Sequence, residues 1–182
     1  MRILGIDPGL ERIGYGIIDR IGSRMIVVDY GLIETPRIEM PQRIRLAHER
    51  MLEIIDEHKP DCLATERLLF TVNKTTAMDV AKSLGVILLA GAEKGLDWCE
   101  YSPPEVKQSV TGVGNADKKQ VQYMVTRLLG LKETPKPDDV ADGLAVAITH
   151  AMRCRVPKPG GSPPIAISER KPRAVNREPL RV

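Results

Sequence analysis

The feature that most constrains the fold is a short apolar strand at the start of the chain that ends on an acid. Residues 2–7 read RILGID, and Pro8 and Gly9 follow at once. Proline biases the residue before it toward extended backbone, so the strand continues up to Asp7 before Pro-Gly turns the chain. A carboxylate at the end of a buried strand costs free energy unless a donor or a cation compensates it. Asp7 therefore either caps a turn or belongs to a site at the rim of a sheet.

The elements that follow predict one mixed sheet. Strands at 13–19 and 25–33, joined by short glycine-containing turns, favour an antiparallel meander. Apolar residues at helical spacing predict helices at 40–58 and 75–93. The remaining predicted elements are strands at 62–66 and 98–101, a short helix from 103, and helices at 117–129 and 138–152. This α/β order resembles the ribonuclease-H-like fold, a mixed five-stranded sheet with helices on both faces.

The composition predicts a single folded domain without a membrane anchor. The chain has 182 residues, 42% of them hydrophobic, which is enough for one real core. No apolar run is long enough to span a bilayer, and residues 1–10 enter a strand pattern without the features of a secretory signal. We therefore expect a cytoplasmic protein. Its three cysteines lack metal-site spacing and are expected to be reduced.

The character of the chain changes near residue 156. Residues 151–182 carry eight Lys or Arg and two acids, a net of +6, which leaves −3 on residues 1–150. We predict a folded ribonuclease-H-like domain over 1–155 and a basic, Pro/Gly-rich disordered tail over 156–182. The tail either attracts phosphate or is a solvated extension, while any affinity of the domain for nucleic acid must come from local patches.

Further acids support a functional role for Asp7. Glu66 ends a second apolar strand, and Asp138, Asp139 and Asp142 open the last predicted helix. Asp139 and Asp142 are three residues apart and so share a helix face, whereas Asp138 is better placed to cap the helix. The helix dipole favours acids in a first turn, so capping alone explains this last group if the helix is considered in isolation.

Considered together, these acids predict a metal site. Carboxylates at the ends of neighbouring elements would gather at one rim of the sheet and repel one another without cations. The motifs contain no sulfur or imidazole, so hard ions such as Mg²⁺ or Mn²⁺ fit. Two such ions about 3.5–4 Å apart can carry phosphodiester hydrolysis.

Four stretches of the chain resemble those of one known family. They are LGIDPGL at 4–10 with Gly14 and Gly16, ATE at 64–66, VKQ at 106–108 followed by TG at 111–112 and KKQV at 118–121, and DVADGLA at 139–145. In this order they make residues 1–155 similar to the RuvC family of Holliday junction resolvases. The first stretch alone also fits actin-like ATPases, which need two such domains and a Gly-rich adenosine site. A third alternative is a nuclease-fold binding module without activity.

The resemblance implies a structure-selective endonuclease of DNA recombination and repair. It implies a homodimer that resolves a four-way DNA junction by symmetric paired nicks, together with a RuvA–RuvB branch-migration complex. Each subunit would use two Mg²⁺ ions, which Mn²⁺ can replace. The catalytic metal ligands it implies are Asp7, Glu66, Asp139 and Asp142.

The resemblance also implies DNA-binding residues. Lys107 and Lys118 match basic positions near the scissile phosphate, and Lys119 follows directly; the alternative for each is a solvated helix position. The family commonly stacks an aromatic residue on unpaired bases at the position of Leu69. Here the aromatic is Phe70, which either takes over the stacking or packs under its loop.

Three further expectations concern residues outside the acid cluster. Gly143 stands where the family usually has alanine, at a cost of about 1 kcal/mol in helix propensity. The histidines at 48, 58 and 150 are expected to be structural or on the surface. Leu89 lies in an apolar stretch broader than one buried stripe, which favours the 75–93 helix as a dimer contact.

Overall fold

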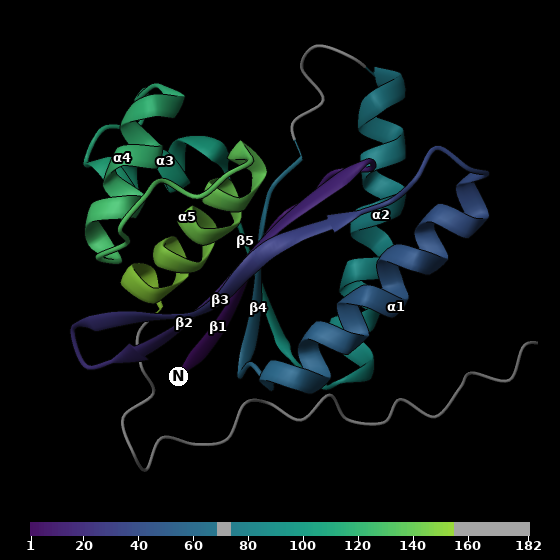
Figure 1. Cartoon of the computed structure of the whole chain (residues 1–182), viewed down its shortest axis with the longest axis horizontal. Coiled ribbons are helices and arrows are strands. Elements are labelled where there is room, and N and C mark those ends of the chain that lie inside the picture. The colour runs from purple at the N-terminus through teal and green to yellow at the C-terminus, as the bar shows by residue number, and fades with distance from the viewer. Residues whose placement is uncertain (69–73, 155–182) are drawn as a thin grey trace, which may run out of the picture.

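A computed structural model describes residues 1–68 and 74–154, and it contains one five-stranded sheet in the order β3-β2-β1-β4-β5 (Figure 1). The strands are β1 (Arg2–Asp7), β2 (Arg12–Ile21), β3 (Arg24–Glu34), β4 (Cys62–Glu66) and β5 (Asp97–Tyr101). The helices are α1 (Met40–His58), α2 (Lys74–Glu93), α3 (Pro103–Thr111), α4 (Lys118–Leu128) and α5 (Asp138–Arg153). Leu69, Phe70 and the predicted tail lie outside the described residues.

The predicted mixed sheet is confirmed. Strand β1 is central and pairs antiparallel with β2 and parallel with β4, while β2 and β3 form the expected hairpin. Both hairpin strands are longer than predicted, because pairing continues to Ile21 and Arg24 on either side of a tight turn. Gly22 makes that turn possible with a φ of +61°, which lies in the left-handed region that favours glycine.

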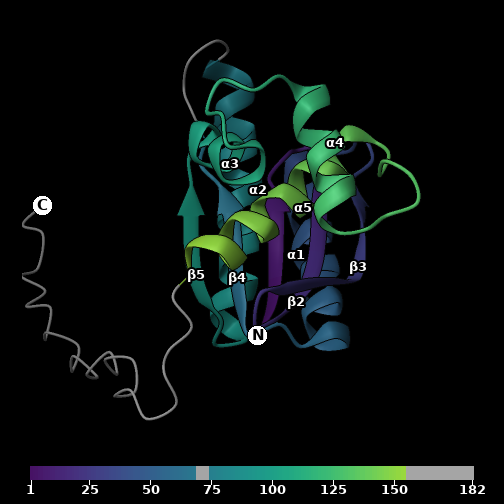
Figure 2. The ribbon, with the colours of Figure 1, turned by 90° about the vertical axis from the view of Figure 1, so that its left-hand side faces the viewer.

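Helices cover both faces of the sheet, as predicted. In Figure 1, α1 and α2 lie on one side of the strands, and α3, α4 and α5 lie on the other. Successive side chains of a strand point to opposite faces, so Ile3 packs in the core under α3–α5 while Leu4 and Ile6 pack in the core under α1 and α2. The view turned by 90° shows α5 crossing directly over the strands (Figure 2).

Small residues bring α5 unusually close to the sheet. A Cβ atom at Gly143 would lie 2.8 Å from the carbonyl oxygen of Gly14, and one at Gly14 would overlap the carbonyl oxygen of Asp139. Glycine at position 143 weakens the helix, but it allows the backbone of α5 to pack directly on the backbone of β2, and this contact compensates for the loss. This contact fixes the first turns of α5 over the end of β1.

The predicted structural roles of the histidines agree with their contacts. His48 lies 3.0 Å from Glu93 and His58 lies 3.2 Å from Asp29, both as side-chain pairs. His150 is buried in α5, where its ring nitrogens contact the Tyr101 hydroxyl and the Cys62 thiol. No disulfide joins Cys62, Cys99 or Cys154 within the part of the chain that the structure describes. None of the helices in the described ranges combines the length and apolarity of a membrane span.

Candidate active site

Asp7 and Glu66 are brought together by the register of two parallel strands. The β1–β4 pairing runs from Ile3 opposite Cys62 to Ile6 opposite Thr65, and the next residues along the two strands are the two acids. Because side chains alternate, Asp7 shares the face of Ile3, and Glu66 shares the face of Cys62 and Ala64. Both carboxylates therefore emerge at the same rim, on the side covered by α5.

The first turns of α5 complete an acidic pocket at this rim. Asp142 lines one pocket together with Asp7, Glu66, Lys107 and Lys118, which we call the acid pocket. Five elements contribute these residues, two strands and three helices. The sequence prediction that the strand-end acids meet the last helix is thus matched by their positions, although the roles of these acids remain predictions.

The surroundings of the acid pocket oppose ionisation of its three carboxyl groups, so the pKa of each is raised. Burial, followed by the charges of Asp142, Glu66 and Asp139, raises the pKa of Asp7 to about 8. Burial and Asp142 raise the pKa of Glu66 to about 7, against the opposing charges of the two lysines. Burial also raises the pKa of Asp142 above its ordinary range. The site therefore holds more negative charge than its own cations balance.

Lys118 is the closest of these cations to the acids. Its Nζ lies 3.1 Å from Asp142 and 3.4 Å from Asp138. Burial works to lower the pKa of Lys118, but its hydrogen bonds and attraction to the two acids outweigh it, so that pKa is raised. Lys118 is the first residue of α4, whose start is held by a capping box in which Asp117 and Gln120 exchange two hydrogen bonds of 2.9 Å.

The other two predicted lysines differ in position. Lys107, in α3, lines the acid pocket, and its charge acts to lower the pKa of Glu66. Helix α3 begins with two prolines and is held by Glu105, which accepts hydrogen bonds from the amide and hydroxyl of Ser102. Lys119 is exposed and does not line the acid pocket. A DNA contact by Lys119 stays a prediction.

Asp139 lies in a neighbouring pocket. It pairs with Arg12, whose Nε is 3.3 Å from Asp139 Oδ2, and that oxygen is buried without a hydrogen bond. We call the pocket lined by Arg12, Lys118, Lys136, Asp138 and Asp139, with Pro137, the bridging pocket. Lys118 borders both pockets, and the charge of Asp139 still reaches Asp7. The charges of the other three predicted acids thus all act on Asp7.

The prediction that Asp138 caps the last helix is wrong. The N-cap residue is Pro137, and Asp138 is the first residue of α5, where its side chain accepts a hydrogen bond of 2.8 Å from Gln122. A capping side chain comes from the residue just before the helix, and Pro137 at that position makes no side-chain capping hydrogen bond. Asp138 instead links α5 to α4 through Gln122 and Lys118.

Arg12 and Lys136 are site residues that the sequence did not indicate. Arg12 opens β2, and its partner Asp139 is distant along the chain. A basic residue at the start of a strand is common on any protein surface, so the sequence alone does not mark Arg12 as a site residue. The packing of α5 on β2 brings Asp139 next to it. Lys136 lies in the segment between α4 and α5, and it likewise depends on the position of α5.

The donor set fits a hard divalent cation. It consists of carboxylate oxygens whose ionisation is opposed by burial and mutual repulsion, and it includes the buried Asp139 oxygen without a hydrogen bond. Within residues 1–68 and 74–154, no three Asp, Glu, His or Cys side chains are already arranged around one point as ligands. Binding a cation through three of these carboxylates would therefore require rotation of their side chains.

Comparisons with known proteins agree with these features. The sequence profile of the family described as "Crossover junction endodeoxyribonuclease RuvC" matches residues 3–150. The chain is 47% identical to the protein of that name from Halothermothrix orenii, over 89% of this chain and 99% of the relative. It is 50% identical to the one from Alkaliphilus metalliredigens, over 83% of this chain and 93% of the relative. Among solved structures, "T. thermophilus RuvC in complex with Holliday junction substrate" superimposes with a TM-score of 0.80 and 36% identity, covering 84% of this chain and 93% of the other.

Proposed function

The chain belongs to the RuvC family of crossover junction endodeoxyribonucleases, and we propose that it resolves four-way DNA junctions by hydrolysing phosphodiester bonds at the acid pocket. The observation that carries the proposal is the meeting of Asp7, Glu66 and Asp142 in one pocket beside two lysines. This pattern favours nuclease chemistry over an inactive binding module, because burying so many acids is costly unless they hold cations. An actin-like ATPase would need a second domain of this kind.

We assign the metal-ligand role to the four acids Asp7, Glu66, Asp139 and Asp142. Bound divalent cations would supply a polarised water and stabilise charge on the leaving oxygen. The acids would hold two Mg²⁺ ions, for which Mn²⁺ can substitute, and Lys107 and Lys118 place positive charge where negative charge develops on the phosphate. Buried Val106, Val121 and Ala145 form an apolar part of the pocket lining, and a lining of low polarity strengthens these electrostatic effects.

Two symmetric nicks need two acid pockets, so we propose that the protein acts as a homodimer. Helix α2 offers a contact surface, since Leu89 and Met78 are 50% and 57% exposed on it. We further propose that the dimer works in the cytoplasm, in recombination and repair, with a RuvA–RuvB branch-migration complex. Base stacking at the junction centre by Phe70 or Leu69 remains part of the proposal.

Substitution Asp7→Asn tests the function directly. It removes the charge of one ligand while keeping the shape, so we expect junction binding close to that of the unmodified protein and a loss of cleavage of at least about 1,000-fold in Mg²⁺. Asp97→Asn is the matched control, because Asp97 is an exposed acid at the opposite end of the sheet. Normal cutting by Asp7→Asn in a junction-cleavage gel would overturn the assignment of the site.

A further inference from the structure

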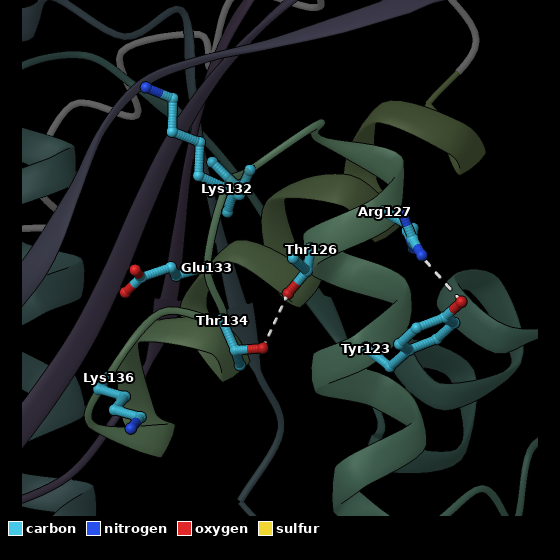
Figure 3. A pocket seen from close by; sticks show the side chains of 8 residues that line it. Tyr123, Thr126, Arg127, Lys132, Glu133, Thr134 and Lys136 are labelled. Atoms are coloured by element: carbon cyan, nitrogen blue, oxygen red, sulfur yellow. Dashed lines mark hydrogen bonds between the residues drawn. The ribbon is translucent and has the colours of Figure 1, made fainter.

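Three pockets form a continuous row that leads away from the acid pocket. The acid pocket and the bridging pocket share Lys118, and the bridging pocket shares Lys136 with a third pocket between α4 and the segment that precedes α5. We call this third one the linker pocket. It is lined chiefly by Tyr123, Thr126, Arg127, Lys132, Thr134 and Lys136 (Figure 3).

The linker pocket carries uncompensated positive charge. Arg127, Lys132 and Lys136 are exposed, and Glu133 is the one acid on the pocket wall. Within the described ranges, no carboxylate lies within ion-pair distance of any of these three cations. By contrast, Lys82 pairs with Asp79 and Lys94 pairs with Asp56. Since residues 1–150 have a net charge of −3, this cluster is a local basic patch in an otherwise slightly acidic domain.

Neutral contacts hold the linker pocket in shape. The Thr126 hydroxyl donates to Thr134 at 3.3 Å, and the amide of Leu131 donates to the Thr126 carbonyl at 2.9 Å. Figure 3 shows the Thr126–Thr134 bond between the Lys132 and Lys136 side chains on one side and Tyr123 and Arg127 on the other.

Arg127 is oriented by a tyrosine rather than by an acid. Its Nε donates to the Tyr123 hydroxyl at 3.2 Å, and its guanidinium carbon lies 5.3 Å from the centre of the ring. Both partners are exposed, so the guanidinium faces solvent, and its contacts with Tyr123 hold it in a defined position. Preorganised cations lose less side-chain entropy on binding a polyanion than freely rotating ones.

These observations assign a second DNA contact. We propose that the linker pocket binds backbone phosphates of the duplex arm that extends from the acid pocket, with Lys136 continuing the path from Lys118 and with Lys132 and Arg127 at its far end. The inference rests on the proposed function and adds to it a site for DNA outside the cleavage centre. The spread of the cations along a row suits successive phosphates of a strand better than one small anion.

The double substitution Lys132→Gln and Lys136→Gln tests this inference, with Lys59→Gln and Lys94→Gln as the control double. The control removes the same charge from residues at the ends of α1 and α2, on the other face of the sheet. Binding of a four-way junction is measured by fluorescence anisotropy in EDTA across a series of salt concentrations. We expect the linker double to bind about 10-fold more weakly and its salt slope to flatten by about 2, one for each lost phosphate contact.

The outcomes separate this inference from the proposed function. Unchanged affinity and salt slope in the linker double, or an equal loss in both doubles, would overturn the linker contact. If the unmodified protein neither binds nor cuts junctions, the proposed function fails instead. Circular dichroism and thermal unfolding of both doubles establish that each remains folded.

Discussion

The stability of the metal-free protein should fall as the pH rises, and Asp7 should cause most of that fall. The ordinary pKa of its carboxyl is 3.8, and burial with the charges of Asp142, Glu66 and Asp139 raises it to about 8. An acid with a raised pKa in the folded state favours the fold while it is protonated. This contribution is complete below the unfolded pKa near 4 and is lost as the pH rises through about 8.

The magnitude follows from the distance between the two pKa values. At about 1.4 kcal/mol for each pH unit, the rise of the Asp7 pKa corresponds to about 6 kcal/mol if the site is rigid. Asp7 keeps some contact with solvent and Lys118 offsets part of the repulsion, so we expect about 3 kcal/mol. Asp7→Asn is neutral at every pH and should lack this loss.

Urea unfolding in EDTA at about pH 5 and about pH 9 measures the effect. The unmodified protein should lose about 3 kcal/mol more of its free energy of unfolding over this range than Asp7→Asn does. Asp97→Asn should behave like the unmodified protein, because Asp97 is exposed and distant from the site. Equal losses in all three proteins would refute the electrostatic account of the acid pocket.

Three other substitutions probe the site and its support. Gly14→Ala places a methyl group against the Asp139 carbonyl, so we expect a loss of about 3 kcal/mol in urea unfolding; unchanged stability would show that α5 can move away freely. Lys118→Ala should slow single-turnover cleavage by about 100-fold with little change in junction affinity. If the affinity fell by the same factor as the cleavage rate, Lys118 would contribute only to binding. Leu89→Glu should give monomers by light scattering. An unchanged dimer mass would show that the dimer interface does not include Leu89 of α2.

The elements of the fold could be predicted from the sequence because each depends on local patterns. Short apolar runs bounded by turns mark the strands, helical spacing marks the helices, and Pro8 ends β1 at Asp7. Two apolar strands that each end on an acid, Asp7 and Glu66, also indicate a shared rim, since parallel neighbours end at the same edge of a sheet. The identities of the acids in the pocket were therefore accessible from sequence.

The partners of these acids depend on tertiary packing. Asp139 faces Arg12 rather than the acid pocket, and Asp138 contacts Gln122 rather than capping its helix, because the glycine contact sets the height and rotation of α5 on the sheet. The same placement brings Lys136 beside the acids and joins three pockets into one row. By itself the sequence determined which residues are acidic and where each strand ends. Only the three-dimensional packing decided which charge faces which, because a side chain's neighbours come from segments far apart in the chain.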